Sequence, residues 1–468
     1  MKKAVWGRSL LAAATVSLLL LSTACGASSA PVKEVSITLS DSYYELFTED
    51  EWNASGHQEV IPEFVTDSSI GYRNADGTRT LYYYASPIHY FDAAGGIHTI
   101  DTRLANVADE SLHQQGYWYT AAGSDILPYF PGELSAASGI RLAKGSQFYT
   151  FAPAGDAVSA PRYGEKTTFL GEKRPALTYR GALGDGLDLV VYPSSLGANS
   201  EVMLGRDLGE DENVAFWITL PDPDMTLQME NGGYLTVRVP SEEGKTEILG
   251  VIQRPLIKTR DGDISFRNSL EIDSEEDGRY LVSFSLDREA TQKGSTVFLS
   301  FEMRREKQPD NCLYSGYPYL EYAYLTNFSV LGNSVECGIG RLMIRFLITR
   351  PFGLTAEDIL SATYSVRSLN NVDQPFELRT VLGDWCSMAG NWSKDYPVGD
   401  RTAVCTPKDN EFVFDITDEV KMWCGDPQCI LEQYGVQLRA CDETEGQYAV
   451  MLSNDNSLYR NRTVITLR

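Results

Sequence analysis

Histidine is scarce in this chain: there are only four, His57, His89, His98 and His113, and none follows His113. The scarcity excludes a metal centre built from several histidines in the second half of the chain. The hydrolase motifs Gly-x-Ser-x-Gly and His-Glu-x-x-His and the phosphate-binding loop Gly-x-x-x-x-Gly-Lys-Ser/Thr are also missing. No motif therefore indicates a serine hydrolase, a zinc protease or a nucleotide-binding enzyme.

Positive charge is in deficit, because 40 lysines and arginines face 64 aspartates and glutamates, for a net charge of −24. This balance excludes nucleic acid and anionic lipid headgroups as partners. It suits a solvated exterior protein that attracts divalent cations. No cofactor is expected, but Asp222-Pro-Asp224 and Asp261-Gly-Asp263 place oxygen ligands on turns and leave calcium open. Turn formation alone is the simpler explanation of both motifs.

Cysteine is absent between Cys25 and Cys312 and then frequent up to Cys441. Outside the cytoplasm this distribution predicts disulfides confined to the second half of the chain. The number of cysteines from Cys312 to Cys441 is odd, so at least one thiol is free or pairs with another chain. Cys424 and Cys429 enclose a turn and can close a small loop, with zinc as the rival interpretation of that pair. The candidates are Cys312, Cys337, Cys386, Cys405, Cys424, Cys429 and Cys441.

Only one long apolar run occurs, Leu10 to Leu21, and it follows three basic residues near the amino terminus. It is shorter than the roughly 20 residues of a membrane-spanning helix, which indicates an export signal. The junction Ala24-Cys25 resembles the bacterial lipobox, whose cysteine receives diacylglycerol. We therefore expect a lipoprotein signal peptide at 1–24, a lipidated tether at 25–37 and attachment through Cys25 to the outer side of the cell membrane. An ordinary signal peptide cut near Ala24 is the alternative.

Helix-forming runs are scarce, whereas tyrosine (26 residues) and glycine (39 residues) are abundant. Short β-branched and aromatic segments recur about every ten residues, with turn signals such as Asn74-Ala75-Asp76-Gly77 and Asp277-Gly278 between them. This pattern predicts an all-β protein: a multi-stranded β-sandwich-like region over 38–308, possibly two subdomains, and a jelly-roll β-sandwich over 309–468. The one clear helix is expected over Asp415 to Trp423, with Thr417 as its cap and with Val420 and Trp423 facing the core.

His89 and His98 flank the turn from Asp92 to Gly96, so they can face each other across a hairpin. A cross-strand pair of histidines is a metal-site pattern. A structural hairpin pair is the favoured interpretation, because His98 lies between Ile97 and Ile100.

Several blocks resemble bacterial wall-associated proteins in which such blocks precede a DNRLRE domain. In the first half they are Arg73-Asn74-Ala75-Asp76-Gly77-Thr78, Pro87-Ile88-His89-Tyr90-Phe91-Asp92, Gly95 to Thr102 and Gly186 to Pro193. In the second half, Arg341 to Phe346, Leu360-Ser361-Ala362, Gly390-Asn391-Trp392 and Phe414 to Thr417 resemble a divergent DNRLRE domain. Leu347 departs from the aspartate that often follows the arginine-phenylalanine strand. The resemblance implies a surface location and a β-sandwich of carbohydrate-binding type, and it implies no reaction.

Together these features predict a non-enzymatic cell-surface lipoprotein for adhesion or for binding cell-wall or host glycans. Trp385 and Trp392 are the candidates for stacking on sugar rings, although jelly-roll cores also use tryptophan. The alternative is an extracellular hydrolase of polysaccharides or its accessory module, since carboxylates are too numerous for a glycosidase-like pair to be excluded by counting. A transport-linked solute receptor is the third class, and the lack of helices between strands speaks against it.

Overall fold

Strands account for most of the chain in this computed structural model, and every pairing between described strands is antiparallel. The predicted all-β, sandwich-type class is therefore confirmed. Helices are few and short: α1 (Glu49–Ser55), η2 (Pro62–Phe64), α2 (Glu110–Gln114) and α3 (Thr417–Gly425). In the described part of the chain, no helix combines the length and apolarity that crossing a membrane requires. The structure describes residues 46–47, 49–66, 68–84, 87–92, 96–210, 212–230, 233–240, 246–309, 320–322, 328–334, 338–346, 353–383, 397–425, 435–444, 446–452 and 462–468.

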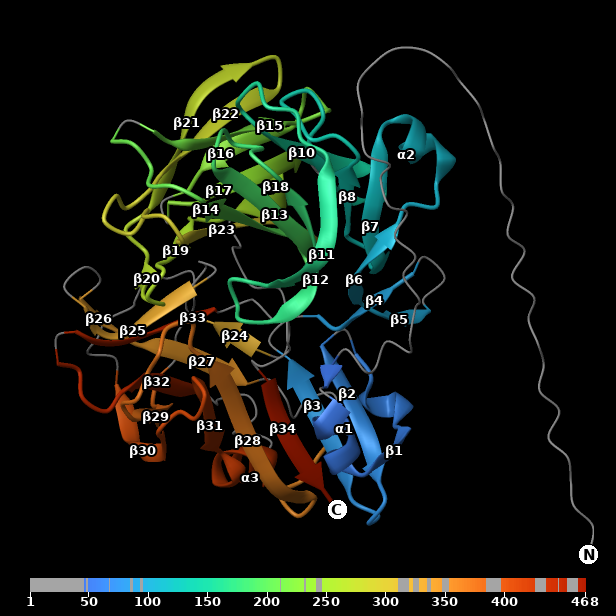
Figure 1. Cartoon of the computed structure of the whole chain (residues 1–468). Helices are drawn as coiled ribbons and strands as arrows, with labels where there is room; N and C mark the ends of the chain where they lie inside the picture. Colours follow the sequence, from blue (N-terminus) through green and yellow to red (C-terminus); the bar gives the residue numbers. More distant parts are fainter. Residues whose placement is uncertain are drawn as a thin grey trace, which may run out of the picture. The chain divides into compact units, whose positions relative to one another are not determined.

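Two large sheets form the first sandwich (Figure 1). The eight-stranded sheet runs β21 (Ser269–Glu276), β22 (Arg279–Ser285), β15 (Val214–Thr219), β10 (Gln147–Pro153), β9 (Ile140–Lys144), β8 (Leu127–Pro131), β7 (Tyr117–Gly123) and β6 (Asp101–Asn106). The second sheet runs β11 (Pro161–Thr167), β12 (Lys173–Tyr179), β13 (Leu187–Ser194), β14 (Gly197–Leu204), β23 (Thr296–Pro309), β18 (Thr246–Ile252), β17 (Leu235–Pro240) and β16 (Thr226–Met229), with β19 (Leu256–Lys258) and β20 (Ile264–Ser265) branching from β23.

Aromatic side chains hold these two sheets together. Phe151 of β10 stacks on Phe301 of β23 with ring centroids 3.8 Å apart, and Phe216 of β15 packs at an angle against both rings. The approach is so close that a Cβ atom on Gly250 would lie 2.9 Å from the ring of Tyr149. Only glycine fits at that point of β18. Burial of these rings stabilises the sandwich.

Two further sheets form the second sandwich. The six-stranded sheet runs β1 (His57–Val60), β2 (Ser69–Asn74), β3 (Arg79–Tyr84), β34 (Arg462–Leu467), β28 (Ile359–Arg367) and β31 (Glu411–Asp415). The five-stranded sheet runs β24 (Leu320–Tyr322), β27 (Leu342–Phe346), β32 (Val436–Ala440), β29 (Phe376–Val381) and β30 (Val398–Cys405). Smaller sheets are β26 (Gly338–Gly340), β25 (Phe328–Ser334) and β33 (Gln447–Leu452), and the pair β4 (His89–Phe91) and β5 (Ile97–Thr99).

One apolar cluster fills the space between these sheets. It includes Phe412 and Phe414 of β31 and Phe376 of β29. Helix α3 closes one side with Val420 and Trp423, which are 0% and 2% exposed, so the predicted inward face of this helix is confirmed. Thr417 is the first residue of α3 and does not cap it as expected: its hydroxyl accepts from the Ala362 N–H, while Asp415 Oδ1 accepts the Thr417 N–H at 3.0 Å.

The six-stranded sheet combines the two ends of the chain. β3 pairs with β34, and Leu81 lies opposite Ile465; Figure 1 shows the two strands side by side. The Arg79 Nε–H also donates to the Arg468 carbonyl, 389 positions away. The expected division at residue 309 and the jelly-roll topology of 309–468 stay predictions. In this sheet, strands β1, β2 and β3 of the expected region 38–308 are joined to strands β34, β28 and β31 of the expected region 309–468.

Candidate functional site

The face of the five-stranded sheet that points away from the apolar cluster is polar. Along β29, Phe376 and Leu378 belong to that cluster, whereas Glu377 and Arg379 alternate with them and point to the other side. The same alternation holds in β32, where Arg439 lies opposite Glu377 in the register. Charged side chains of neighbouring strands are thereby brought onto one face.

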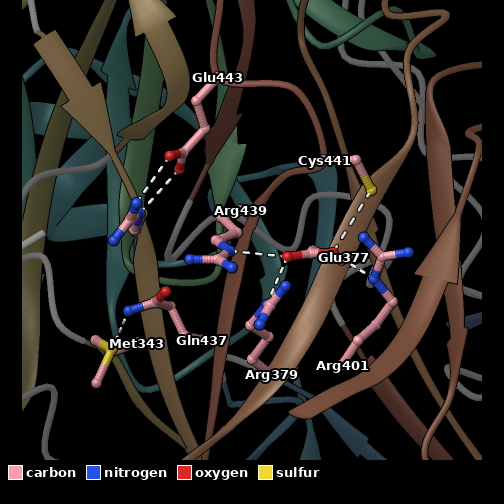
Figure 2. A network of polar contacts seen from close by, with 9 residues as sticks. Met343, Glu377, Arg379, Arg401, Gln437, Arg439, Cys441 and Glu443 are labelled. Carbon is pink, nitrogen blue, oxygen red and sulfur yellow. Dashed lines mark hydrogen bonds and ion pairs between the residues drawn. The ribbon is translucent and has the colours of Figure 1, made fainter. Parts of the chain in front are cut away.

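Glu377 is the centre of this face, and three arginines surround it (Figure 2). Its Oε1 accepts from the Nε–H of Arg379 at 2.6 Å and from the Nε–H of Arg439 at 2.9 Å. Its Oε2 accepts from the Nε–H of Arg401, on β30, at 2.5 Å. We call these four residues the Glu377 cluster. Three strands, β32, β29 and β30, contribute to it, so the register of the sheet sets its geometry.

The carboxylate of Glu377 is charged despite its burial. Its side chain is 3% exposed, and this desolvation is the largest influence on its pKa and raises it. The hydrogen bonds from Arg379, Arg439 and Arg401 outweigh the desolvation and hold the pKa below its usual value. With one negative and three positive groups, the Glu377 cluster carries two positive charges in excess. The local charge is therefore positive, whereas the chain as a whole is acidic.

The guanidinium groups retain unused donors. Each of the three contacts with Glu377 uses the Nε–H alone. Within the described residues, the Nη atoms of Arg379, Arg401 and Arg439 make no further hydrogen bond or ion pair. Solvent reaches these side chains, which are 27%, 51% and 16% exposed respectively. The arrangement can therefore bind an anion without dismantling the existing contacts.

Neighbouring groups complete this face. The Cys441 thiol lies 3.9 Å from Glu377 Oε2, and burial, followed by the Glu377 charge, raises its pKa, so the thiol stays protonated. Gln437 donates to Met343 Sδ at 3.5 Å, while its own Oε1 is buried without a partner in the described structure. Arg341 and Glu443 form a bidentate pair with two 2.8 Å bonds.

A second polar assembly lies inside the ten-stranded sheet. Tyr192, Asn199 and Ser300 are register partners on adjacent strands, and the Gln253 N–H donates to the Ser300 carbonyl. All four are at most 5% exposed. Among the described residues, Asn199 Nδ2 and both amide atoms of Gln253 have no partner. Such a row belongs to the interior and not to a surface that a polymer reaches.

Glu201 lies beside this row. Its Oε1 accepts from the Phe169 N–H and from the Tyr192 hydroxyl, each at 2.7 Å. Burial raises the pKa of Glu201 to about 7, although these hydrogen bonds and the charges of Lys258 and Arg174 lower it. This carboxyl group changes its charge near neutral pH, in contrast to Glu377.

The cysteines give the disulfide prediction no support. Cys405, Cys424 and Cys441 are free thiols in the structure. Cys405 ends β30 and Cys441 follows β32, and each contacts a polar group: Cys405 contacts the Thr406 carbonyl and Cys441 contacts Glu377. The remaining disulfide candidates, Cys312, Cys337, Cys386 and Cys429, lie outside the described residues. The predicted lipidation site, Cys25, lies outside them too.

The expected histidine pair is not formed. His89 lies opposite Thr99, and His98 lies opposite Tyr90, so the register places the two histidines one position apart and on opposite faces of the hairpin. His98 contacts Asp92 at 2.8 Å instead, and the buried His89 contacts the Thr66 carbonyl. The prediction was wrong because it required His89 and His98 to be register partners, whereas the hairpin pairs His89 with Thr99.

The other predicted site residues receive no function from the structure. Asp222 Oδ1 accepts the Asp224 N–H at 2.9 Å, and the Asp261 turn is closed by the Thr259 N–H and the Asp263 carbonyl. In the described residues, no three or more His, Cys, Asp or Glu side chains are grouped to hold a metal ion, so calcium has no located site. The stacking candidates Trp385 and Trp392 lie outside the described residues.

The Glu377 cluster was missed at the level of sequence. The signal that bears on it is the alternation Phe376-Glu377-Leu378-Arg379, which places Glu377 and Arg379 on one face of a strand. Arg401 and Arg439 are distant in sequence, and only strand pairing brings them there.

Comparisons with known proteins identify no family for this chain. No protein-family model and no curated protein matches it. One solved structure, described as a crystal structure with a xylogluco-oligosaccharide, is 9% identical over 88% of this chain and 98% of its own, with a TM-score of 0.13. A likeness this weak carries no argument about fold or function.

Proposed function

We propose that this chain is a non-enzymatic binding protein of the bacterial cell surface, which holds a carbohydrate polymer of the cell wall against the polar face of its five-stranded sheet. The observation that carries the proposal is the Glu377 cluster, in which three arginines are fixed by one buried carboxylate and still present N–H donors that no other described residue accepts. Hydrogen-bond donors on a strand face are positioned by the sheet and lose little freedom on binding.

The chemistry of the cluster suits binding better than catalysis. Arginine does not release its proton at physiological pH, so Arg379, Arg401 and Arg439 act as fixed charges and donors. The lowered pKa of Glu377 and the raised pKa of the Cys441 thiol make the first a poor general acid and the second a poor nucleophile. These properties support a non-enzymatic role.

The cellular location in this proposal comes from the sequence. Export through residues 1–24 and lipidation of Cys25 would place the sheet outside the cell, where wall polymers are the nearest ligands. The resemblance to DNRLRE-containing wall proteins points to the same place. Mass spectrometry of the membrane-extracted protein tests the anchor: an amino-terminal cysteine with diacylglycerol is expected, and an unmodified terminus near Ala24 would contradict it.

Binding is tested by incubating the full-length protein in detergent with isolated cell walls and with peptidoglycan. Sedimentation with the walls is the expected result, and a protein that remains in the supernatant with every wall fraction would contradict the proposal. Chromatography of the supernatants separates the alternative, because sugar fragments released from the walls would show a hydrolase.

A further inference from the structure

We propose that the ligand of the five-stranded sheet is an acidic polysaccharide, held by a phosphate or carboxylate group that the outer Nη atoms of Arg379, Arg401 and Arg439 bind. This inference rests on the proposed function and deepens it, because it names the chemical class of the polymer. Neither the composition of the chain nor its net charge of −24 suggests a polyanion as a ligand. The local structure does.

The first argument is the charge at the site. Glu377 neutralises only one of the three guanidinium groups that contact it. Glu443, the other acidic side chain labelled in Figure 2, is already paired with Arg341 through two hydrogen bonds. Two positive charges therefore remain for a ligand. An anion is the ligand that gains most from them.

The second argument is the geometry of the donors. A guanidinium group is a planar fork that matches phosphate and carboxylate oxygens, often through two hydrogen bonds at once. The contacts with Glu377 occupy the Nε–H of each arginine and fix its orientation, so the outer nitrogens are held in place before a ligand arrives. Adjacent strands are about 4.8 Å apart, which lets one anionic group reach the arginines of two strands.

The third argument selects the kind of polyanion. At physiological salt the Debye length is about 8 Å, so the cluster attracts charges close to it and the acidic remainder of the surface repels those farther along. A densely charged polymer such as nucleic acid would extend many phosphates over that acidic surface. A polysaccharide separates its charged groups by sugar rings, and it can offer one group to the cluster while its hydroxyl groups contact the protein around it.

The proposal is tested by measuring the binding of the full-length protein to three polymers by calorimetry. Polygalacturonate carries carboxylates, a phosphomannan carries phosphates, and dextran is neutral. We expect binding to at least one acidic polymer and weaker binding to dextran. Arg401→Gln should weaken the acidic interaction about tenfold, because one charge-assisted contact is lost, and Arg401→Lys should weaken it less. Arg401 is the most exposed of the three arginines, so its replacement disturbs folding least.

A further variant separates the site from general charge effects. Arg260→Gln removes the same charge from an exposed turn in the first sandwich, where the side chain is 72% exposed, and should leave the affinity unchanged. Equal losses of affinity in Arg260→Gln and Arg401→Gln would show a general charge effect and contradict the proposed site.

The outcomes distinguish this inference from the function on which it rests. Equal binding of dextran and the acidic polymers, or an affinity for acidic polymers that Arg401→Gln leaves unchanged, overturns the inference even where the protein sediments with walls. Absence of binding to walls together with Arg401-dependent binding of an acidic polymer supports the inference and overturns the wall-binding function. A preference for phosphate or for carboxylate identifies the group that the arginines hold.

Discussion

The hydroxyl of Tyr192 donates a 2.7 Å hydrogen bond to Oε1 of Glu201, and the two side chains are 0% and 2% exposed. They come from the paired strands β13 and β14, two residues out of register on the same face of the sheet. Oε1 also accepts the Phe169 N–H. A protonated carboxyl group accepts both hydrogen bonds, as the carboxylate does. The pair therefore tolerates a neutral Glu201.

The contribution of Glu201 to the stability of the fold should fall as pH rises through this titration. The folded pKa of Glu201 is about 7 against a reference value of 4.5. Both states are protonated below pH 4.5, and between 4.5 and 7 the unfolded chain loses its proton first, so the free energy of unfolding decreases and levels off above 7. Glu201→Gln keeps both accepted hydrogen bonds and should be more stable than the parent at pH 8, by about 3 kcal/mol, and nearly equal at pH 4. Urea unfolding at several pH values measures this.

A matched control for that experiment is Glu165→Gln on the edge strand β11, where the glutamate is exposed. This variant should follow the parent at every pH. A Glu201→Gln protein that is less stable than the parent at pH 8 would show that a partner charge stabilises the buried carboxylate. It would contradict the view that burial of Glu201 destabilises its charged form.

Removal of the Glu377 carboxylate should be costly. Glu377→Ala leaves three guanidinium groups close together, two of them mostly buried, without their common partner. Loss of one side of a buried ion network typically costs 3–5 kcal/mol, so we expect a decrease of about 3 kcal/mol or more in the free energy of unfolding. Asp261→Ala breaks an exposed ion pair with Arg260 and should change it by less than about 1 kcal/mol. Similar costs for both variants would contradict this role of Glu377.

Local signals explain what was predicted correctly. Asp277 and Gly278 both have positive φ angles, 49° and 74°, as a two-residue hairpin turn requires, and they connect β21 to β22 where the turn was expected. In β15 buried and less buried residues alternate strictly, but the apolar run Val214 to Ile218 does not reveal this alternation in the sequence. A turn depends on neighbouring residues only, so a single sequence reveals it.

Long-range pairing explains what was missed. Nothing in the segment Arg79–Tyr84 indicates that its partner is Arg462–Leu467 at the other end of the chain. Strand β8 contains Pro128 and Pro131, which are poor strand residues; it forms where β7 and β9 flank it. The same limit hid the Glu377 cluster, whose charges meet only after β29 pairs with β30 and β32.

The three described cysteines should differ in reactivity. Cys424 is 6% exposed, and burial raises the pKa of its thiol to about 11, so very little thiolate forms at pH 8. Cys405 is partly exposed. Iodoacetamide at pH 8 should therefore modify Cys405 much faster than Cys424 in the native protein, and both equally in denaturant, as mass spectrometry of the peptides would show. Protection of Cys405 that only a reducing agent removes would instead indicate a disulfide.

The stacked pair Phe151 and Phe301 should be the most sensitive point of the first sandwich. Phe301 is fully buried, and its ring lies 3.8 Å from that of Phe151 at an interplanar angle of 5°. Phe301→Ala leaves a cavity between two sheets that are joined by backbone pairing and cannot collapse fully, so a loss of about 3–5 kcal/mol is expected from denaturant unfolding. Phe91→Ala, at a residue that is 53% exposed, should cost less than about 1 kcal/mol. The double variant with Phe151→Ala should be less damaging than the sum of the single ones, because the contact between the two rings is lost only once. Additive losses would mean that each ring stabilises its own sheet and that the contact between them contributes nothing.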